Sequence, residues 1–156
     1  MRQRLRALHA EDFAPYGTVF APPSIGERTE IAGYLQNLRM SAAFVCYINH
    51  RKPIALPQTV AVMERHRFSS QAFLPLSVSR YIVAVAPPDQ DGLPDANKLC
   101  CFVASREQTI NYNAGVWHCP LMVLDTPAQF AVLMWRDGSD DDEEFIHLNV
   151  PLQILE

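Results

Sequence analysis

The chain has 156 residues, of which 49% are apolar, so it can bury one sizeable hydrophobic core but is too short for two ordinary domains. Its formal net charge of −4 excludes the strongly basic surface that binding to nucleic acid or to an anionic membrane requires. No hydrophobic run reaches membrane-spanning length and no signal-peptide core follows the basic start, so we expect one cytoplasmic domain over residues 1–156.

The predicted elements are one short helix followed by a series of strands. Capping-type residues before an apolar turn predict a helix over Ala10–Phe13, and Pro15-Tyr-Gly17 ends it. Beyond it, β-branched or aromatic runs closed by proline, glycine or acidic residues predict strands at Thr18–Ala21, Ala42–Asn49, Thr59–His66, Gln71–Leu76, Tyr81–Ala86, Leu99–Ala104, Gln108–Asn111, Met122–Asp125 and Phe130–Trp135. Such a pattern predicts a mainly β fold, either a sandwich or a barrel, and a barrel of this size can hold a small ligand.

Three polar stretches and the cysteines complete the outline. Pro22–Gly33 and Pro87–Pro94 are predicted to be surface loops, and the acidic run Asp137–Glu144 a solvated loop. Of the four cysteines, Cys100 and Cys101 are adjacent and no C-x-x-C spacing occurs, so we expect free thiols.

One polar group with chemical potential lies between Met63 and Gln71. Because side chains alternate along a strand, Glu64 and His66 share one face and the arginine between them takes the other. If the chain turns over at Phe68–Ser70, the amide of Gln71 returns close to them, and these groups can hold a divalent metal ion. The alternative is that Glu64 pairs with a neighbouring arginine at the surface and His66 merely ends a strand.

A second polar group surrounds His118. Asn113–Gly115 is a turn signal, so Tyr112 and His118 are expected to flank a tight bend whose exit Pro120 fixes. Trp117 places apolar surface beside His118, and burial favours a neutral imidazole suited to base chemistry or metal ligation. The alternative is a histidine that is simply packed in the core.

Two segments resemble the signature sequences of the ureidoglycolate lyase family, namely Glu64-Arg-His-Arg-Phe-Ser-Ser-Gln-Ala-Phe-Leu-Pro75 and Asn111-Tyr-Asn-Ala-Gly-Val-Trp-His-Cys-Pro-Leu121. The similarity extends to Phe13-Ala-Pro-Tyr-Gly17 near the start and to Arg136-Asp-Gly-Ser139 near the end. It covers most of the chain, and the two central motifs are specific.

The resemblance implies a cupin-like β-barrel, usually a homodimer, that splits the small ureido acid ureidoglycolate into glyoxylate and urea in purine and allantoin breakdown. It also implies a divalent metal ion such as nickel or manganese, although the need for metal is not uniform across the family. The positions that match the cupin metal ligands are Glu64, His66, Gln71 and His118.

The chain departs from the family pattern at three places. Trp117-His-Cys-Pro120 stands where the family commonly has Trp-His-His-Pro, so a role of the second histidine is lost or passes to Cys119. Trp135 replaces the usual acidic residue before the late arginine, and the early pattern of Asn-Gly followed by arginine is not obvious between Gly26 and Arg39. These departures concern the substrate more than the fold.

The expected chemistry follows from the substrate. One carbon of ureidoglycolate carries a hydroxyl, a ureido nitrogen and a carboxylate, so removal of the hydroxyl proton lets the carbonyl form as the carbon–nitrogen bond breaks. We expect His118 to act as the base, with Glu64 or His66 as the acid or as metal ligands. The residues expected to bind the substrate are Arg136, Tyr112 and Gln71, of which Arg136 can anchor the carboxylate or can be a strand-end charge facing water.

Two rival functions remain open at this point. One is a related enzyme that acts on another ureido or hydroxy acid. The other is a non-catalytic cupin-like sensor that binds a small carboxylate with an incomplete catalytic set.

Overall fold

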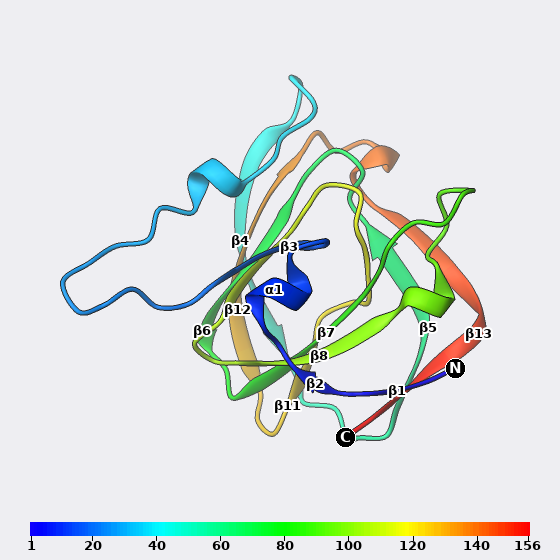
Figure 1. The fold of residues 1–156 in the computed structure, drawn as a ribbon. Coiled ribbons are helices and arrows are strands. Elements are labelled where there is room, and N and C mark those ends of the chain that lie inside the picture. Colours follow the sequence, from blue (N-terminus) through cyan, green and yellow to red (C-terminus); the bar gives the residue numbers. More distant parts are fainter.

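The computed structural model describes residues 1–156, whose strands form two sheets in a cupin-like β-barrel (Figure 1). The eight-stranded sheet has the order β1 (Arg2–Arg4), β13 (Glu144–Leu155), β5 (Gln58–Arg65), β10 (Trp117–His118), β7 (Arg80–Ala86), β8 (Cys100–Ser105) and β2 (Arg6–Ala7), with β11 (Met122–Leu124) also on β7. The five-stranded sheet has the order β3 (Gly17–Phe20), β9 (Thr109–Tyr112), β6 (Gln71–Ser77), β12 (Ala128–Arg136) and β4 (Ala43–Arg51). The helices are α1 (Ala10–Phe13) and the single turns η1 (Ala32–Tyr34), η2 (Ala96–Lys98) and η3 (Asp140–Asp142).

The predicted mainly β barrel with a short N-terminal helix is confirmed. Helix α1 has the predicted bounds, and each predicted strand is present with ends no more than two residues away. Strands β1, β2 and β10 were not predicted because they are only two or three residues long, too short to show a period. Strand β13 was also missed, because its register shifts between His147 and Leu152 and interrupts the alternation.

The N-terminal segment nearly closes the eight-stranded sheet. Strand β1 pairs in parallel with β13, and β2, which follows directly in the chain, pairs in parallel with β8. These partners lie near opposite ends of the strand order, so one short segment connects both sides of the sheet (Figure 1). The free edge strand β4 is left at the end of the other sheet.

The hydrophobic core has two parts, one on each face of the eight-stranded sheet. Along β7, Tyr81 and Val83 belong to the cluster that also contains Phe130 of the five-stranded sheet. The residues between them, Ile82 and Ala84, belong to the cluster on the opposite face. Strand β7 is therefore buried on both sides, which explains its continuous apolar sequence.

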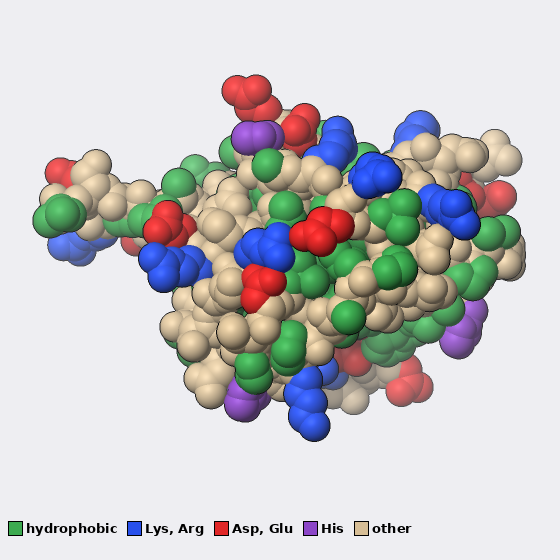
Figure 2. Space-filling view, turned by 90° about the horizontal axis from the view of Figure 1, so that it is seen from below, with side chains coloured by type: hydrophobic (Ala, Val, Ile, Leu, Met, Phe, Trp, Pro, Cys, Tyr) green, Lys and Arg blue, Asp and Glu red, His purple; other side chains and the backbone are tan.

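The surface loops agree with most of the predictions. The Pro22–Gly33 segment projects from the body of the barrel and is exposed (Figures 1 and 2). On the face shown in Figure 2, acidic and basic side chains are interspersed with apolar ones, with no continuous basic field. All four cysteines are free thiols. Neither α1 nor any other helix has the length and apolar character that crossing a bilayer requires.

The prediction for the acidic run is wrong in part. Residues 137–141 are exposed as expected, but Asp142 is buried and Glu144 begins β13. The carboxylate of Asp142 accepts hydrogen bonds from Arg39 and from the backbone amides of Asp137 and Gly138. Composition shows that a stretch is acidic, but it does not show that one carboxylate folds inward to meet a distant arginine.

Candidate functional site

Two chain turns bring the predicted site residues together. The turn after Arg65 leads from β5 in the eight-stranded sheet to β6 in the five-stranded sheet. The bend at residues 113–116 likewise leads from β9 in the five-stranded sheet to β10 in the eight-stranded sheet. The predicted turn and the predicted bend are both present, but each joins strands of different sheets. A hydrogen bond of 2.8 Å from the Gly115 amide to the His66 carbonyl joins the two turns.

Strand pairing places the side chains opposite one another. In the eight-stranded sheet His118 pairs with Glu64, and in the five-stranded sheet Tyr112 pairs with Gln71. Because the two turns lie together, these pairs face each other. Nε2 of His118 is 3.1 Å from Oε1 of Gln71 and 3.4 Å from Oε1 of Glu64. The Tyr112 ring stacks on the His118 ring with 4.2 Å between centroids and a 12° interplanar angle.

The backbone fixes the orientation of both imidazoles. Nδ1 of His66 is 2.8 Å from the carbonyl oxygen of Asp142, and Nδ1 of His118 is 2.9 Å from that of Val116. Since a carbonyl oxygen can only accept, Nδ1 carries the proton in each ring and Nε2 is left for the site. The buried Nε2 of His66 has no hydrogen-bond partner. This nitrogen therefore has a lone pair that can accept a proton or bind a cation.

Burial and neighbouring charges shift the pKa values of Glu64 and His66. Burial alone would raise the pKa of Glu64, but hydrogen bonding and attraction to His118, with further attraction to His66 and Arg51, lower it below its usual value. The pKa of His66 is lowered by burial and by the neighbouring His118. An ionised carboxylate therefore lies beside a neutral imidazole at neutral pH.

The donor set fits a metal ion. One ligand atom from each of Glu64, His66 and His118 lies within 4.8 Å of the other two. Imidazole nitrogens with a carboxylate suit a divalent transition metal, and the carbonyl-anchored Nδ1 atoms provide the outer support that metal-binding histidines usually have. The side-chain oxygen of Gln71 points at the same Nε2 of His118 and can supply a fourth ligand.

Beside this cluster lies a cavity of about 230 Å³, here called the polar cavity. Its lining residues are Tyr47, Asn49, Arg51, Glu64, His66, Gln71, Phe73, Leu121, Glu143 and Phe145. His118 and Tyr112 do not line it, because they lie behind Glu64 and Gln71, where they are buried. The three lining residues from β4 were not predicted as site residues, since an alternating Tyr-Ile-Asn-His-Arg sequence is typical of any half-exposed strand.

Arg136 does not line the polar cavity itself, although its partner Glu143 does. Its guanidinium is 2.9 Å from the carboxylate of Glu143 and 3.5 Å from that of Asp142. Its predicted role as the carboxylate anchor stays a prediction, but two acidic side chains already neutralise its charge.

Cys119 does not replace the second histidine of the family pattern. It is buried on the opposite face of the eight-stranded sheet, in the cluster that contains Trp117 and Met63. Burial raises the pKa of its thiol well above the usual value. The thiol therefore takes no part in the site.

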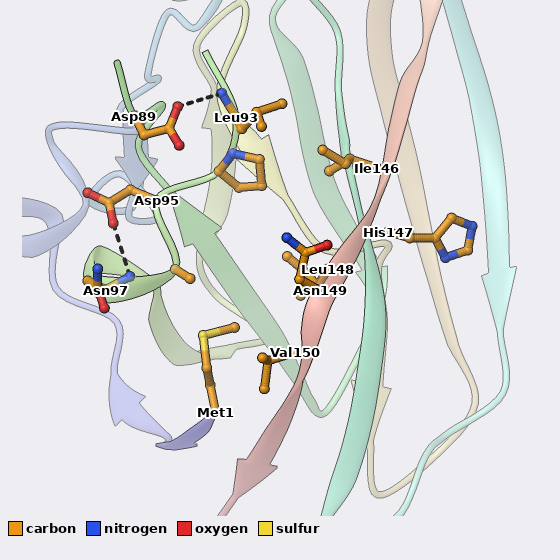
Figure 3. A pocket seen from close by; sticks show the side chains of 12 residues that line it. Met1, Asp89, Leu93, Asp95, Asn97, Ile146, His147, Leu148, Asn149 and Val150 are labelled. Atoms are coloured by element: carbon orange, nitrogen blue, oxygen red, sulfur yellow. Dashed lines mark hydrogen bonds between the residues drawn. The ribbon is translucent and has the colours of Figure 1, made fainter. Parts of the chain in front are cut away.

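A second hollow of about 460 Å³ lies between β13 and the loop before β8 (Figure 3). The carboxylate of Asp89 accepts from the Leu93 amide, and that of Asp95 accepts from the Asn97 amide. The side chain of His147 points away from the hollow. This hollow is larger than the polar cavity, but its carboxylates accept hydrogen bonds from amides of the loop itself. It contains no acid–base pair.

Comparison with known proteins assigns the chain to a family. The model of the family described as ureidoglycolate lyase matches residues 2–154. Proteins named ureidoglycolate lyase are similar to the chain: one from Burkholderia cepacia is 37% identical over 83% of this chain and 77% of its own length. One from Rhizobium etli is 31% identical over 97% of this chain and 95% of its own. One from Escherichia coli is 30% identical over 90% of this chain and 91% of its own.

A solved structure supports the fold independently. The crystal structure of a dTDP sugar isomerase from Desulfovibrio desulfuricans superposes with a TM-score of 0.51, at 16% identity, over 82% of this chain and 80% of that chain. At that identity the similarity concerns the fold alone. The match over residues 2–154 and the relatives above 30% identity that cover most of the chain carry the assignment, and the chain belongs to the ureidoglycolate lyase family.

Proposed function

We propose that this protein cleaves ureidoglycolate into glyoxylate and urea. The observation that carries the proposal is the cluster of Glu64, His66, Gln71 and His118, which lies beside a small polar cavity in a chain of this family. The volume of about 230 Å³ suits a ligand of few heavy atoms. The relatives named ureidoglycolate lyase support this substrate.

The reaction needs one proton to move from the substrate hydroxyl to the departing urea nitrogen. Glu64 faces the polar cavity and its carboxylate is paired with buried His118, so the two can take up this proton as a unit. The carbonyl group then forms as the carbon–nitrogen bond breaks, and the same unit returns the proton to nitrogen. No water is consumed. His118, expected from the sequence to be the base, would in this scheme act on the substrate through Glu64.

Tyr112 and Gln71 orient the Glu64–His118 pair. The stacked Tyr112 ring covers one side of the His118 imidazole, and burial raises the pKa of its phenol, so it stays uncharged. Gln71 lines the polar cavity and contacts Nε2 of His118, so it can bridge substrate and imidazole.

A divalent metal ion, nickel or manganese, would be held by Glu64, His66 and His118 with Gln71, and when bound it would polarise the substrate hydroxyl and lower its pKa. The buried, unpartnered Nε2 of His66 is the feature that supports this assignment.

The test of the proposed function is a product assay. Purified protein is incubated with ureidoglycolate, with and without added nickel or manganese, and glyoxylate, urea and ammonia are measured. We expect equal amounts of glyoxylate and urea, and a loss of activity after chelation that the added metal restores. Release of ammonia would instead indicate a hydrolase, turnover of another ureido or hydroxy acid alone a related enzyme, and binding without turnover a sensor.

We propose that the protein forms a homodimer through the outer face of the five-stranded sheet. Phe44, Ile48 and Leu76 leave 50%, 59% and 57% of their surface exposed there, and β4 has a free edge. A second copy of this face would cover them. The Ile48→Glu variant should sediment as a monomer when the wild type sediments as a dimer, whereas Val150→Glu on β13 should not change the association. A wild type that is monomeric at tens of micromolar would refute the homodimer.

We also propose a cytoplasmic location. The four free thiols support a reducing compartment, since exposed cysteines such as Cys46 rarely persist unpaired in an oxidising one. Cell fractionation would detect the protein elsewhere if this were incorrect.

A further inference from the structure

Strand β4 forms one wall of the polar cavity, and the scheme above gives its side chains no part in binding or catalysis. Side chains alternate along this strand, so Tyr47, Asn49 and Arg51 line the polar cavity while Phe44 and Ile48 are exposed on the outer face. Arg51 is the last residue of β4 and pairs with Ala128 at the start of β12. The wall therefore has a phenol, an amide and a guanidinium spaced two residues apart.

Arg51 is the basic side chain among the lining residues of the polar cavity, which otherwise has two carboxylates, Glu64 and Glu143. Glu143 is paired with Arg136, so Glu64 is the carboxylate that would repel an anionic substrate unless a cation offsets its charge. Arg51 is close enough to Glu64 for its charge to help lower the pKa of that carboxyl. Arg51 is an exposed residue that lines the polar cavity, so it supplies positive charge on the solvent side of the site.

The guanidinium of Arg51 is also free of ion pairs. Arg39 is held by Asp137 and Asp142, and Arg136 by Glu143 and Asp142. In contrast, no acidic oxygen lies within 4.0 Å of Arg51, and none of the ion pairs of the molecule includes it. An unpaired guanidinium can bind a carboxylate with two parallel hydrogen bonds.

We propose that Arg51 binds the carboxylate of the substrate, with the amide of Asn49 as a second donor, and so selects short 2-hydroxy and 2-oxo acids. The inference rests on the proposed function for the identity of the substrate. A carboxylate held at Arg51 leaves the hydroxyl and the ureido nitrogen to Glu64 and Gln71, which also line the polar cavity. Arg51 is thus a binding and specificity-determining residue for the same site.

The test measures binding and turnover in the full-length protein. Glyoxylate, the anionic product, and urea, the neutral one, are titrated into wild type, Arg51→Gln and Arg51→Lys by calorimetry. We expect Arg51→Gln to weaken glyoxylate binding about tenfold or more and to leave urea binding unchanged. Arg51→Lys should bind glyoxylate more weakly than the wild type and more tightly than Arg51→Gln, because it keeps the charge but loses the planar pair of donors. For turnover of ureidoglycolate, KM should rise more than kcat falls.

Two control variants separate charge from position. Arg106→Gln removes the same charge from a side chain that is 73% exposed outside the polar cavity, and it should bind glyoxylate as the wild type does. Arg136→Gln tests the arginine predicted from the sequence. The melting temperature of each variant shows whether it folds.

The outcomes distinguish this inference from the proposed function. Glyoxylate binding that depends on Arg51 in a protein that releases no urea would support the carboxylate site and refute the lyase. Normal urea release with unchanged glyoxylate affinity in Arg51→Gln would refute the assignment of Arg51 and leave the lyase intact. A wild type that binds no glyoxylate at millimolar concentration, or a loss of affinity in Arg136→Gln alone, would also overturn it.

Discussion

Replacing His118 with asparagine is expected to slow urea release by about 100-fold to 10,000-fold while the barrel stays folded. The asparagine amide can still reach the carbonyl of Val116, which now accepts from Nδ1 at 2.9 Å. It has no group at the position of Nε2, which lies 3.4 Å from Glu64. The carboxylate then loses the partner that shares its proton, and a bound metal ion loses a ligand.

The measurement for His118→Asn is the rate of urea release at saturating ureidoglycolate, together with the melting temperature. His9→Asn is the matched control, because His9 is an exposed histidine at the start of α1, and this variant should react at the wild-type rate. A folded His118→Asn protein that retains more than about half of the wild-type rate would exclude His118 from the reaction.

Much of the site could be predicted because it is encoded locally. Glu64 and His66 are two residues apart, so strand alternation places them on one face, and the turn at Ser69 and Ser70 returns the chain to Gln71. The short bend before His118 likewise predicts that it lies near Tyr112. Each of these predictions uses only residues that are close together in the sequence.

The parts that could not be predicted depend on contacts between distant segments. The crossing of both turns between sheets is a property of strand order, which the sequence does not state. Arg51 lies in an ordinary strand and becomes a site residue only because the eight-stranded sheet faces it. Asp142 belongs to an acidic run, and only the distant Arg39 distinguishes it from the exposed Asp140 and Asp141.

Asp142 is expected to be the most important of these distant contacts for stability. Its side chain is 2% exposed and bonds Arg39, whose side chain is 13% exposed, while its backbone carbonyl accepts from Nδ1 of His66. Asp142→Ala removes the buried partner of Arg39 and leaves this arginine paired with the more exposed Asp137. The free energy of unfolding should therefore fall by about 3 kcal/mol, the low end for breaking a buried ion pair. The loop that positions His66 should loosen as well, and the kcat of the folded fraction should therefore fall.

Urea denaturation of wild type and Asp142→Ala measures the loss. Asp141→Ala is the matched control, because it removes an exposed carboxylate of the same turn and should leave the free energy of unfolding nearly unchanged. If Asp142→Ala unfolds at the same urea concentration as Asp141→Ala, the buried pair contributes nothing to stability.

The carboxylate of Asp142 should also affect how the free energy of unfolding depends on pH. Burial alone would raise the pKa of Asp142, but the hydrogen bonds from Arg39 and from two backbone amides outweigh it and lower the pKa to about 2. A group whose pKa is lowered by folding stabilises the protein above its unfolded pKa, near 3.9, and that contribution is lost as pH falls toward about 2. Between these values the wild type should lose stability more steeply than Asp142→Asn. Parallel stability curves would show that folding does not shift the pKa of Asp142.

A double-mutant cycle measures the interaction free energy between Arg39 and Asp142 separately from the packing of each side chain. Arg39→Met and Asp142→Ala should each destabilise the protein, because each leaves one buried charged or polar group without its partner. The double variant buries neither charge, so its loss should be smaller than the sum of the two single losses by about 1 to 3 kcal/mol. Additive losses would mean that the residues act independently, and that the loop behind His66 is held by the backbone amides of Asp137 and Gly138 alone.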